Sequence, residues 1–311
     1  MSKHFYELQF EIETRCLLDC IHCSSLEMRL NGKRGYSAGD LHRFISCFAD
    51  NAHVYFTGGE PLLFEGLLKL CKSLSDDYGK LSVGLYTTGI CSPAGISAQL
   101  ADQMAHAGIK DCYFSLYSNI AKEHDAWTRL SGSFENTISS IKQLTYVGIV
   151  PKIHLVLNRY NLHKIENIIE FCQGIGVKEV RILRLAPVGN AKKYWSNIGI
   201  SIEEQNEVVE NLINHKMDFS TKLSFSGYPN LHPCRSFPDA IGCQAGTHLL
   251  YVDINGDVFP CACTKSDILR FQIGHITEIN KIKEYVKNRE HVLCNETCLN
   301  EGACHTVSLR E

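Results

Sequence analysis

Hydrophobic and polar positions alternate along the first 186 residues in a way that predicts strands separated by helices. The strand-like runs span residues 5–12, 53–58, 81–88, 110–117, 151–157 and 178–185. Helix-like stretches lie between most of them, at residues 37–51, 62–75, 97–107, 134–147 and 162–175. This order favours an α/β fold with a parallel sheet and right-handed crossovers, either a doubly wound layer or a curved, partly closed barrel. In both cases the loops at the carboxyl ends of the strands form the site.

The pattern changes after about residue 190. A helix is predicted at residues 201–215, and residues 249–261 are typical of a hairpin with Asn255 and Gly256 at its turn. Serines at the starts of three predicted helices indicate capping, and these are Ser37, Ser133 and Ser201. We therefore expect two packed parts, residues 1–190 and residues 191–311.

Composition and charge exclude several classes of protein. Of the 311 residues, 44% are hydrophobic and 21% are charged, which is enough for a sizeable core. The net charge of −3 gives no reason to expect nucleic acid as a partner. The sequence has no apolar run that could cross a membrane, and its first residues lack the features of a signal peptide. We expect a cytoplasmic protein.

The 15 cysteines are the unusual feature of the composition. In a cytoplasmic chain of this length they indicate metal binding rather than disulfides, and an odd number cannot all pair within the chain. Five of them are scattered among the strands and helices and are interpreted as small buried hydrophobic residues: Cys47, Cys71, Cys91, Cys112 and Cys172. The other ten gather toward the two ends of the chain.

Three thiols fall within eight residues just after the first predicted strand, in the segment CLLDCIHC. A structural zinc site needs four protein ligands, and no fourth ligand is evident near Cys16, Cys20 and Cys23. Three thiolates suit a 4Fe–4S cluster in which one iron has no protein ligand and can bind a small molecule. Zinc remains the alternative for this loop.

These residues resemble the signature of the radical S-adenosylmethionine (radical SAM) family, in which such a loop follows the first strand. The segment TGGEP at residues 57–61, which follows the second strand, is similar to the glycine-rich motif of the same family. The resemblance covers about the first 190 residues and implies a partial barrel of six strand–helix units, (β/α)6. It also implies an electron donor such as flavodoxin or ferredoxin as a partner.

The resemblance further implies a reaction and a set of residues that bind the cofactor. An electron from the cluster would split S-adenosylmethionine, and the 5′-deoxyadenosyl radical would take a hydrogen atom from the substrate. Gly58 and Gly59 would allow close approach to the methionine part, Glu60 would hold its ammonium group, and His22 would lie against the adenine. Further cofactor contacts are implied at the ends of later strands, by Thr88, Ser115, Asn158 and Arg184.

The cysteines near the C-terminus are similar to the SPASM and twitch extensions of this family, small α+β domains that carry auxiliary 4Fe–4S clusters. The candidate ligands are Cys243, Cys261, Cys294, Cys298 and Cys304. The spacing of Cys294 and Cys298 departs from that pattern and the closing cysteines are missing, so one auxiliary cluster is favoured over two. A zinc ribbon is the alternative. A leftover thiol could give a hydrogen atom to the substrate, as in some epimerases of the family; the candidates are Cys234, Cys263 and Cys304.

The substrate cannot be read from these motifs. Among family members with auxiliary clusters, modification of ribosomally made peptides by epimerisation, crosslinking or oxidation is the commonest activity, and we adopt it as the expectation. Dehydrogenation or epimerisation of an aminocyclitol or aminoglycoside sugar is the alternative. An iron–sulfur sensor without catalytic activity is the alternative of another class, and TGGEP at the expected place argues against it.

Overall fold

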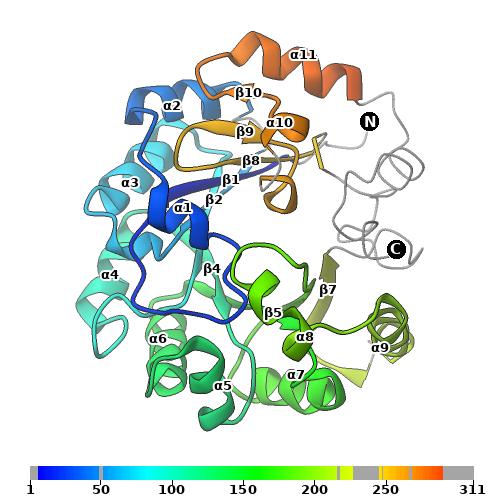
Figure 1. Ribbon diagram of the computed structural model, residues 1–311. Helices are drawn as coiled ribbons and strands as arrows, with labels where there is room; N and C mark the ends of the chain where they lie inside the picture. The colour runs from blue at the N-terminus through cyan, green and yellow to red at the C-terminus, as the bar shows by residue number, and fades with distance from the viewer. Residues whose placement is uncertain are drawn as a thin grey trace.

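Parallel strands form the centre of the protein (Figure 1). The computed structural model describes residues 6–48, 52–215, 218–226, 245–246, 248–265 and 268–289. The strands are β1 Tyr6–Glu13, β2 Ala52–Gly58, β3 Ser82–Thr87, β4 Ile109–Ser115, β5 Val150–Leu157, β6 Glu179–Arg184, β7 Lys222–Ser226, β8 Leu249–Val252, β9 Asp257–Phe259 and β10 Gly274–His275. Within the described ranges they make one sheet in the order β10-β9-β8-β1-β2-β3-β4-β5-β6-β7.

Strands β1 to β7 are parallel to their neighbours, and β8 is parallel to β1. The predicted α/β class and all six predicted strands are confirmed, and β7 is a further parallel strand that the sequence did not predict. The helices are α1 Leu26–Asn31, α2 Ala38–Ser46, α3 Leu67–Asp77, α4 Ala98–His106, α5 Ala121–Thr128, α6 Ser133–Tyr146, α7 Ile165–Gly174, α8 Ala191–Ile198, α9 Ile202–Asn214, α10 Ile268–Phe271 and α11 Ile279–Arg289. None of the described helices is long and apolar enough to span a membrane.

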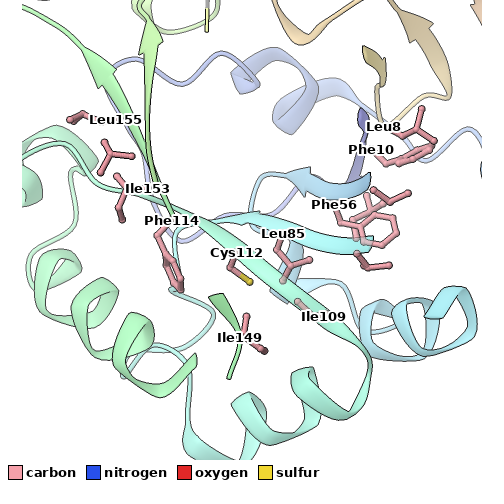
Figure 2. Close-up of a cluster of buried hydrophobic side chains, with 14 of the residues drawn as sticks. Leu8, Phe10, Phe56, Leu85, Ile109, Cys112, Phe114, Ile149, Ile153 and Leu155 are labelled. Carbon is pink, nitrogen blue, oxygen red and sulfur yellow. The ribbon is translucent and has the colours of Figure 1, made fainter. Parts of the chain in front are cut away.

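The outer face of the sheet is apolar and is covered by helices. Leu8 and Phe10 of β1, Phe56 of β2 and Leu85 of β3 are all completely buried there (Figure 2). They alternate along each strand with residues of the opposite face, because successive side chains of a strand point to opposite sides. Helices α2, α3, α4 and α6 lie along this outer side (Figure 1), and their own apolar residues belong to the same core.

The inner face of the sheet is polar and aromatic. Tyr55 stacks on Tyr86 with ring centroids 4.4 Å apart, and Tyr113 stacks on His154 at 4.2 Å. The guanidinium of Arg181 lies 4.4 Å from the centre of the Tyr113 ring. Because these rings come from neighbouring strands, they form a row across the inner face of the sheet.

Two of the three predicted helix caps are confirmed. Ser37 and Ser201 each accept a hydrogen bond from the third helical residue, whose carboxylate accepts one in return. The prediction for Ser133 is wrong, because Ser133 is already inside α6 and Gly132 is the cap. The Asp125 carboxylate accepts hydrogen bonds from the Gly132 and Phe134 amides at 2.6 and 2.8 Å. Asp125 therefore caps the start of α6, the role that the sequence assigned to Ser133.

The residues after position 190 continue the sheet at both of its ends. Strand β7 pairs with β6, and β8 pairs with β1. The predicted hairpin is confirmed as β8 and β9, with Gly256 at a φ of +95° in the turn between them. The division of the chain into two parts at residue 190 stays a prediction. Strands from both sides of this position belong to the same sheet.

We expect Leu85→Ala to lower the free energy of unfolding by about 2–5 kcal/mol, because it opens a cavity in the outer core. Leu269→Ala is the matched control, since Leu269 is fully exposed, and it should change stability by less than about 0.5 kcal/mol. Urea unfolding followed by circular dichroism measures both variants. Equal effects would contradict this assignment of the core.

Candidate functional site

The loop with Cys16, Cys20 and Cys23 connects β1 to α1 and is held at several points. Cys20 is 9% exposed, and the other two thiols are half-buried. Backbone amides of the loop, those of Asp19 and Ile21, donate to carbonyls at the end of α5, each at 3.1 Å. The carbonyls of Cys20 and Cys23 accept from the side chain and the backbone amide of Asn190 at 3.0 and 2.9 Å. The thiols therefore sit on a loop that the surrounding fold fixes in place.

The three thiols provide the type of donor that a 4Fe–4S cluster requires. In the part of the chain that the structure describes, no three His, Cys, Asp or Glu side chains are placed to hold one metal ion. Burial raises the pKa of Cys16 to about 11, and burial followed by the nearby Cys23 and Cys16 raises the pKa of Cys20 well above its usual range. Thiols with such a raised pKa are protonated at neutral pH, and a metal centre that binds them would displace their protons. Donors of this type in this number fit a 4Fe–4S cluster.

The glycines of TGGEP allow two backbones to come very close together. Gly58 has a φ of +139°, and a Cβ there would collide with the Glu13 carbonyl oxygen. A Cβ on Gly59 would collide with the Arg15 carbonyl oxygen. The amides of Gly59 and Glu60 donate to those same carbonyls at 2.7 and 2.8 Å. The two glycines therefore fix the residues from which the cysteine loop begins.

Glu60 is completely buried and joins the ends of β2 and β3. Its carboxylate accepts hydrogen bonds from the Thr87 hydroxyl at 2.6 Å, the Thr88 amide at 2.7 Å and the Thr88 hydroxyl at 2.6 Å, and the Leu62 amide adds a fourth at 3.2 Å. Burial raises the pKa of Glu60 above its usual range, although these donors oppose the shift. The predicted contact of Glu60 with an ammonium group stays a prediction, since all four hydrogen bonds come from the chain itself.

His22 lies in a set of aromatic rings beside the cysteine loop. Its ring stacks on Trp127 with centroids 5.2 Å apart and meets Tyr117 edge-on at 4.7 Å. Burial lowers the pKa of His22 to about 3, so the ring is neutral at physiological pH. Its buried Nδ1 has no hydrogen-bond partner among the described residues. A neutral ring among aromatic residues is suited to contact with a purine.

The other predicted cofactor residues lie at the ends of strands, as the sequence predicted. Ser115 ends β4, Arg184 ends β6, and Thr88 and Asn158 directly follow β3 and β5. Asn158 has a local role, because its side chain accepts from the Tyr160 amide and donates to the Val156 carbonyl, both at 2.9 Å. Their contacts with a cofactor stay predictions.

Only two of the C-terminal cysteines fall within the described residues. Cys261 lies two residues after the end of β9. Cys263 lies close enough that a hydrogen bond between the two thiols, together with burial, raises the pKa of Cys261 well above its usual range. Both thiols are half-buried. The remaining predicted ligands and hydrogen donors lie outside the described residues: Cys234, Cys243, Cys294, Cys298 and Cys304.

Lys265 is the first of the charged residues near the site that the sequence did not single out. Its ammonium group donates to Glu11 Oε1 at 2.6 Å, Ser25 Oγ at 2.7 Å and the Tyr251 hydroxyl at 2.9 Å. The side chains of Lys265 and Glu11 are 6% and 1% exposed. The ion pair thus ties the C-terminal hairpin to β1 and to the residue that follows the cysteine loop. No local signal reveals it, because Glu11 is 254 positions away from Lys265.

Arg29 of α1 is the second. Its guanidinium donates to the Leu18 carbonyl at 3.0 Å and the Cys16 carbonyl at 3.4 Å, and Nη1 lies 3.7 Å from Cys23 Sγ. Arg29, Cys16 and Leu18 also line a hollow of about 460 Å³ at the surface. Only the spacing of six positions from Cys23 hints at this role in the sequence, and helix α1 itself was not predicted.

The chain matches one family model and is similar in sequence to several known proteins. The sequence model of the radical SAM superfamily matches residues 11–172. The chain is 27% identical over 282 residues to the AdoMet-dependent heme synthase of Nitratidesulfovibrio vulgaris, covering 84% of this chain and 74% of that protein. It is 26% identical over 277 residues to a probable GTP 3′,8-cyclase of Saccharolobus solfataricus, covering 85% of this chain and 84% of that one.

Two solved structures have a similar fold. Streptococcus suis SuiB bound to its precursor peptide SuiA superposes with a TM-score of 0.70 at 17% identity, over 98% of this chain and 71% of that chain. The structure of anSMEcpe with bound AdoMet superposes with a TM-score of 0.68 at 17% identity, over 91% of this chain and 82% of that one.

We expect Lys265→Met to lower the free energy of unfolding by about 3–5 kcal/mol, because it leaves the Glu11 carboxylate buried without a counter-charge. Lys72→Met is the matched control, since it breaks an exposed pair with Asp76 and should cost less than about 1 kcal/mol. Anaerobic urea unfolding of the protein without iron measures both.

The same pair gives a dependence on pH. Burial would raise the pKa of Glu11, but Lys265 and the hydrogen bonds to Lys265 and Ser25 hold it below its usual range. The stabilisation by the pair is therefore present above the ordinary pKa of about 4.3 and is lost as the pH falls through the lowered pKa. The difference between wild type and Lys265→Met should shrink on acidification, and a constant difference would contradict the assignment.

Proposed function

Because the chain belongs to the radical SAM superfamily, we propose that it is an enzyme that modifies a ribosomally made peptide. Cys16, Cys20 and Cys23 would hold a 4Fe–4S cluster, and residues 57–61 would hold S-adenosylmethionine beside it. When both are bound and an electron is supplied, they provide a 5′-deoxyadenosyl radical that takes a hydrogen atom from the substrate. The residues of the chain bind and orient these groups and keep water away from them.

The observation that carries this proposal is the direct joining of the two motifs. Arg15 precedes the first thiol of the loop, and its carbonyl accepts the Glu60 amide of TGGEP at 2.8 Å. A cluster held by the loop and a ligand held at TGGEP would therefore keep a fixed relation to each other. A sensor would not require this second motif next to its cluster.

Other side chains would complete the cofactor site. His22, Trp127 and Tyr117 offer aromatic faces for the adenine, and they also exclude water from that side of the loop. Glu60 holds Thr87 and Thr88 at the end of β3 and so keeps the opposite wall in place. Ser115 and Arg184 supply polar groups from the ends of β4 and β6.

A peptide is the proposed substrate because the fold is similar to that of SuiB, which was solved with a precursor peptide, over 98% of this chain. A step of heme synthesis is the second candidate, because the similarity in sequence to an AdoMet-dependent heme synthase extends over 84% of the chain. An auxiliary cluster on Cys261, with Cys243, Cys294, Cys298 and Cys304 as the further candidate ligands, would complete a SPASM-like or twitch-like C-terminal part. Cys263 would then be a candidate hydrogen donor, together with Cys234 and Cys304.

Anaerobic reconstitution with iron and sulfide tests the chemistry. We expect the wild-type protein with dithionite and S-adenosylmethionine to release 5′-deoxyadenosine, measured by liquid chromatography. Replacing Cys16, Cys20 or Cys23 by Ala removes a cluster ligand and should lower the product to the level of a control without enzyme. Cys47→Ala is the matched control, since Cys47 lies at the end of α2, away from the loop, and it should retain activity. A protein that binds a cluster but releases no 5′-deoxyadenosine would contradict the proposal.

Transfer of deuterium tests the substrate class. The probe is a small-peptide extract of cells grown on deuterated amino acids, incubated with the reconstituted enzyme. Because the radical takes a hydrogen atom from the substrate, a peptide substrate should give 5′-deoxyadenosine that is one mass unit heavier. Label that arrives only from cells fed deuterated 5-aminolevulinate would support heme synthesis and exclude the peptide.

A further inference from the structure

Arg29 is a cation that touches the cysteine loop. Other arginines near the loop are paired: Arg15 with Glu13 at 2.7 Å, and Arg129 with Asp19 at 3.1 Å. Among the described residues, no carboxylate forms an ion pair with Arg29. Its electrostatic partners are the three cysteines, and its buried Nε has no hydrogen-bond partner in the described part of the chain. Because burying an unpaired charge is costly, a negative charge at the thiols would stabilise this half-buried guanidinium.

We propose that Arg29 is the counter-charge of the cluster on Cys16, Cys20 and Cys23 and makes that cluster easier to reduce. This inference rests on the proposed function, because it requires a cluster on those thiols. Nη1 lies 3.7 Å from Cys23 Sγ, within the range of a hydrogen bond to sulfur. Arg29 is therefore a positioning and tuning residue, and it takes no part in bond breaking.

The sign of the effect follows from the charges. Reduction by a one-electron donor adds one negative charge to the cluster and changes no other group of the site. A fixed positive charge nearby stabilises the reduced form more than the oxidised form, and hydrogen bonds to cluster sulfurs act in the same direction. Without the charge, the midpoint potential should become more negative.

The two carbonyl contacts add a positional role. The second guanidinium nitrogen donates to the carbonyls of Leu18 and Cys16 at 3.0 and 3.4 Å; Cys16 is the first ligand, and Leu18 lies between the first two. A lysine could keep the charge, but it lacks the planar fork that reaches several acceptors at once. The two roles can therefore be separated by substitution.

The test is a mediated redox titration of the reconstituted cluster, followed by electron paramagnetic resonance, without S-adenosylmethionine. Arg29→Gln removes the charge and should give a more negative midpoint potential than wild type. Arg29→Lys keeps the charge, so its shift in potential should be less than half of the shift caused by Arg29→Gln. Arg15→Gln is the matched control: Arg15 is next to Cys16, but its side chain is 61% exposed and is directed toward Glu13, so water screens its charge. The shift caused by Arg15→Gln should likewise be less than half of that caused by Arg29→Gln.

A fully loaded Arg29→Gln protein with the wild-type potential would overturn the inference. If this variant does not retain iron, Arg29→Lys decides instead, because it keeps the positive charge: it should retain iron and give a potential close to that of the wild type. An Arg29→Lys protein that loses iron as Arg29→Gln does would overturn the inference. A wild-type protein that forms no cluster would refute the proposed function itself, whereas a cluster indifferent to these changes refutes only the role of Arg29.

Discussion

The close backbone contact between residues 58–60 and residues 13–15 is the constraint on which the site depends. Strands β1 and β2 pair in parallel as far as Glu13 and Gly58, and two more hydrogen bonds continue the contact beyond the strands. Only glycine permits this, since a Cβ at Gly58 or Gly59 would collide with the neighbouring carbonyl oxygens. The cysteine loop leaves the sheet at the end of this contact, so its starting point is as rigid as the sheet itself.

The inner face of the sheet limits where chemistry can take place. The carboxylate of Glu7 accepts from the Tyr86 hydroxyl at 2.6 Å and lies 3.5 Å from Arg181, and Glu179 accepts from the Tyr113 hydroxyl at 2.9 Å. The row of stacked rings joins neighbouring strands, and these pairs join strands that are not neighbours in the sheet, such as β1 and β6. Glu7 and Arg181 balance each other there, whereas Arg29 at the cysteine loop forms no ion pair with a carboxylate in the described part of the chain. The ion pairs of the inner face therefore stabilise the fold, whereas Arg29 is placed to interact with a bound group that carries negative charge.

Local sequence patterns predicted much of this fold, because strands and most helices carry their own periodicity. They predicted the six strands, the β8–β9 hairpin and the two motifs that meet at Arg15 and Glu60. They missed the helices α1, α5, α8, α10 and α11 and the strands β7 and β10, and all of these except α11 are eight residues long or shorter. Arg29 and Lys265 could not be found in this way, since their importance comes from partners that only the folded chain brings near.

The C-terminal segment is part of the support for the first cysteine loop. Strand β8 covers the edge of β1, which would otherwise be an open strand edge next to the site. Lys265 supplies the charge that makes the burial of Glu11 tolerable, and its hydrogen bond to Ser25 spans 240 positions. A cut at residue 190 would remove β7 and β8 from the two sides of the parallel sheet and leave Glu11 without its cation. The loop that holds the thiols is therefore shaped by residues from both parts of the chain, whichever substrate the enzyme takes.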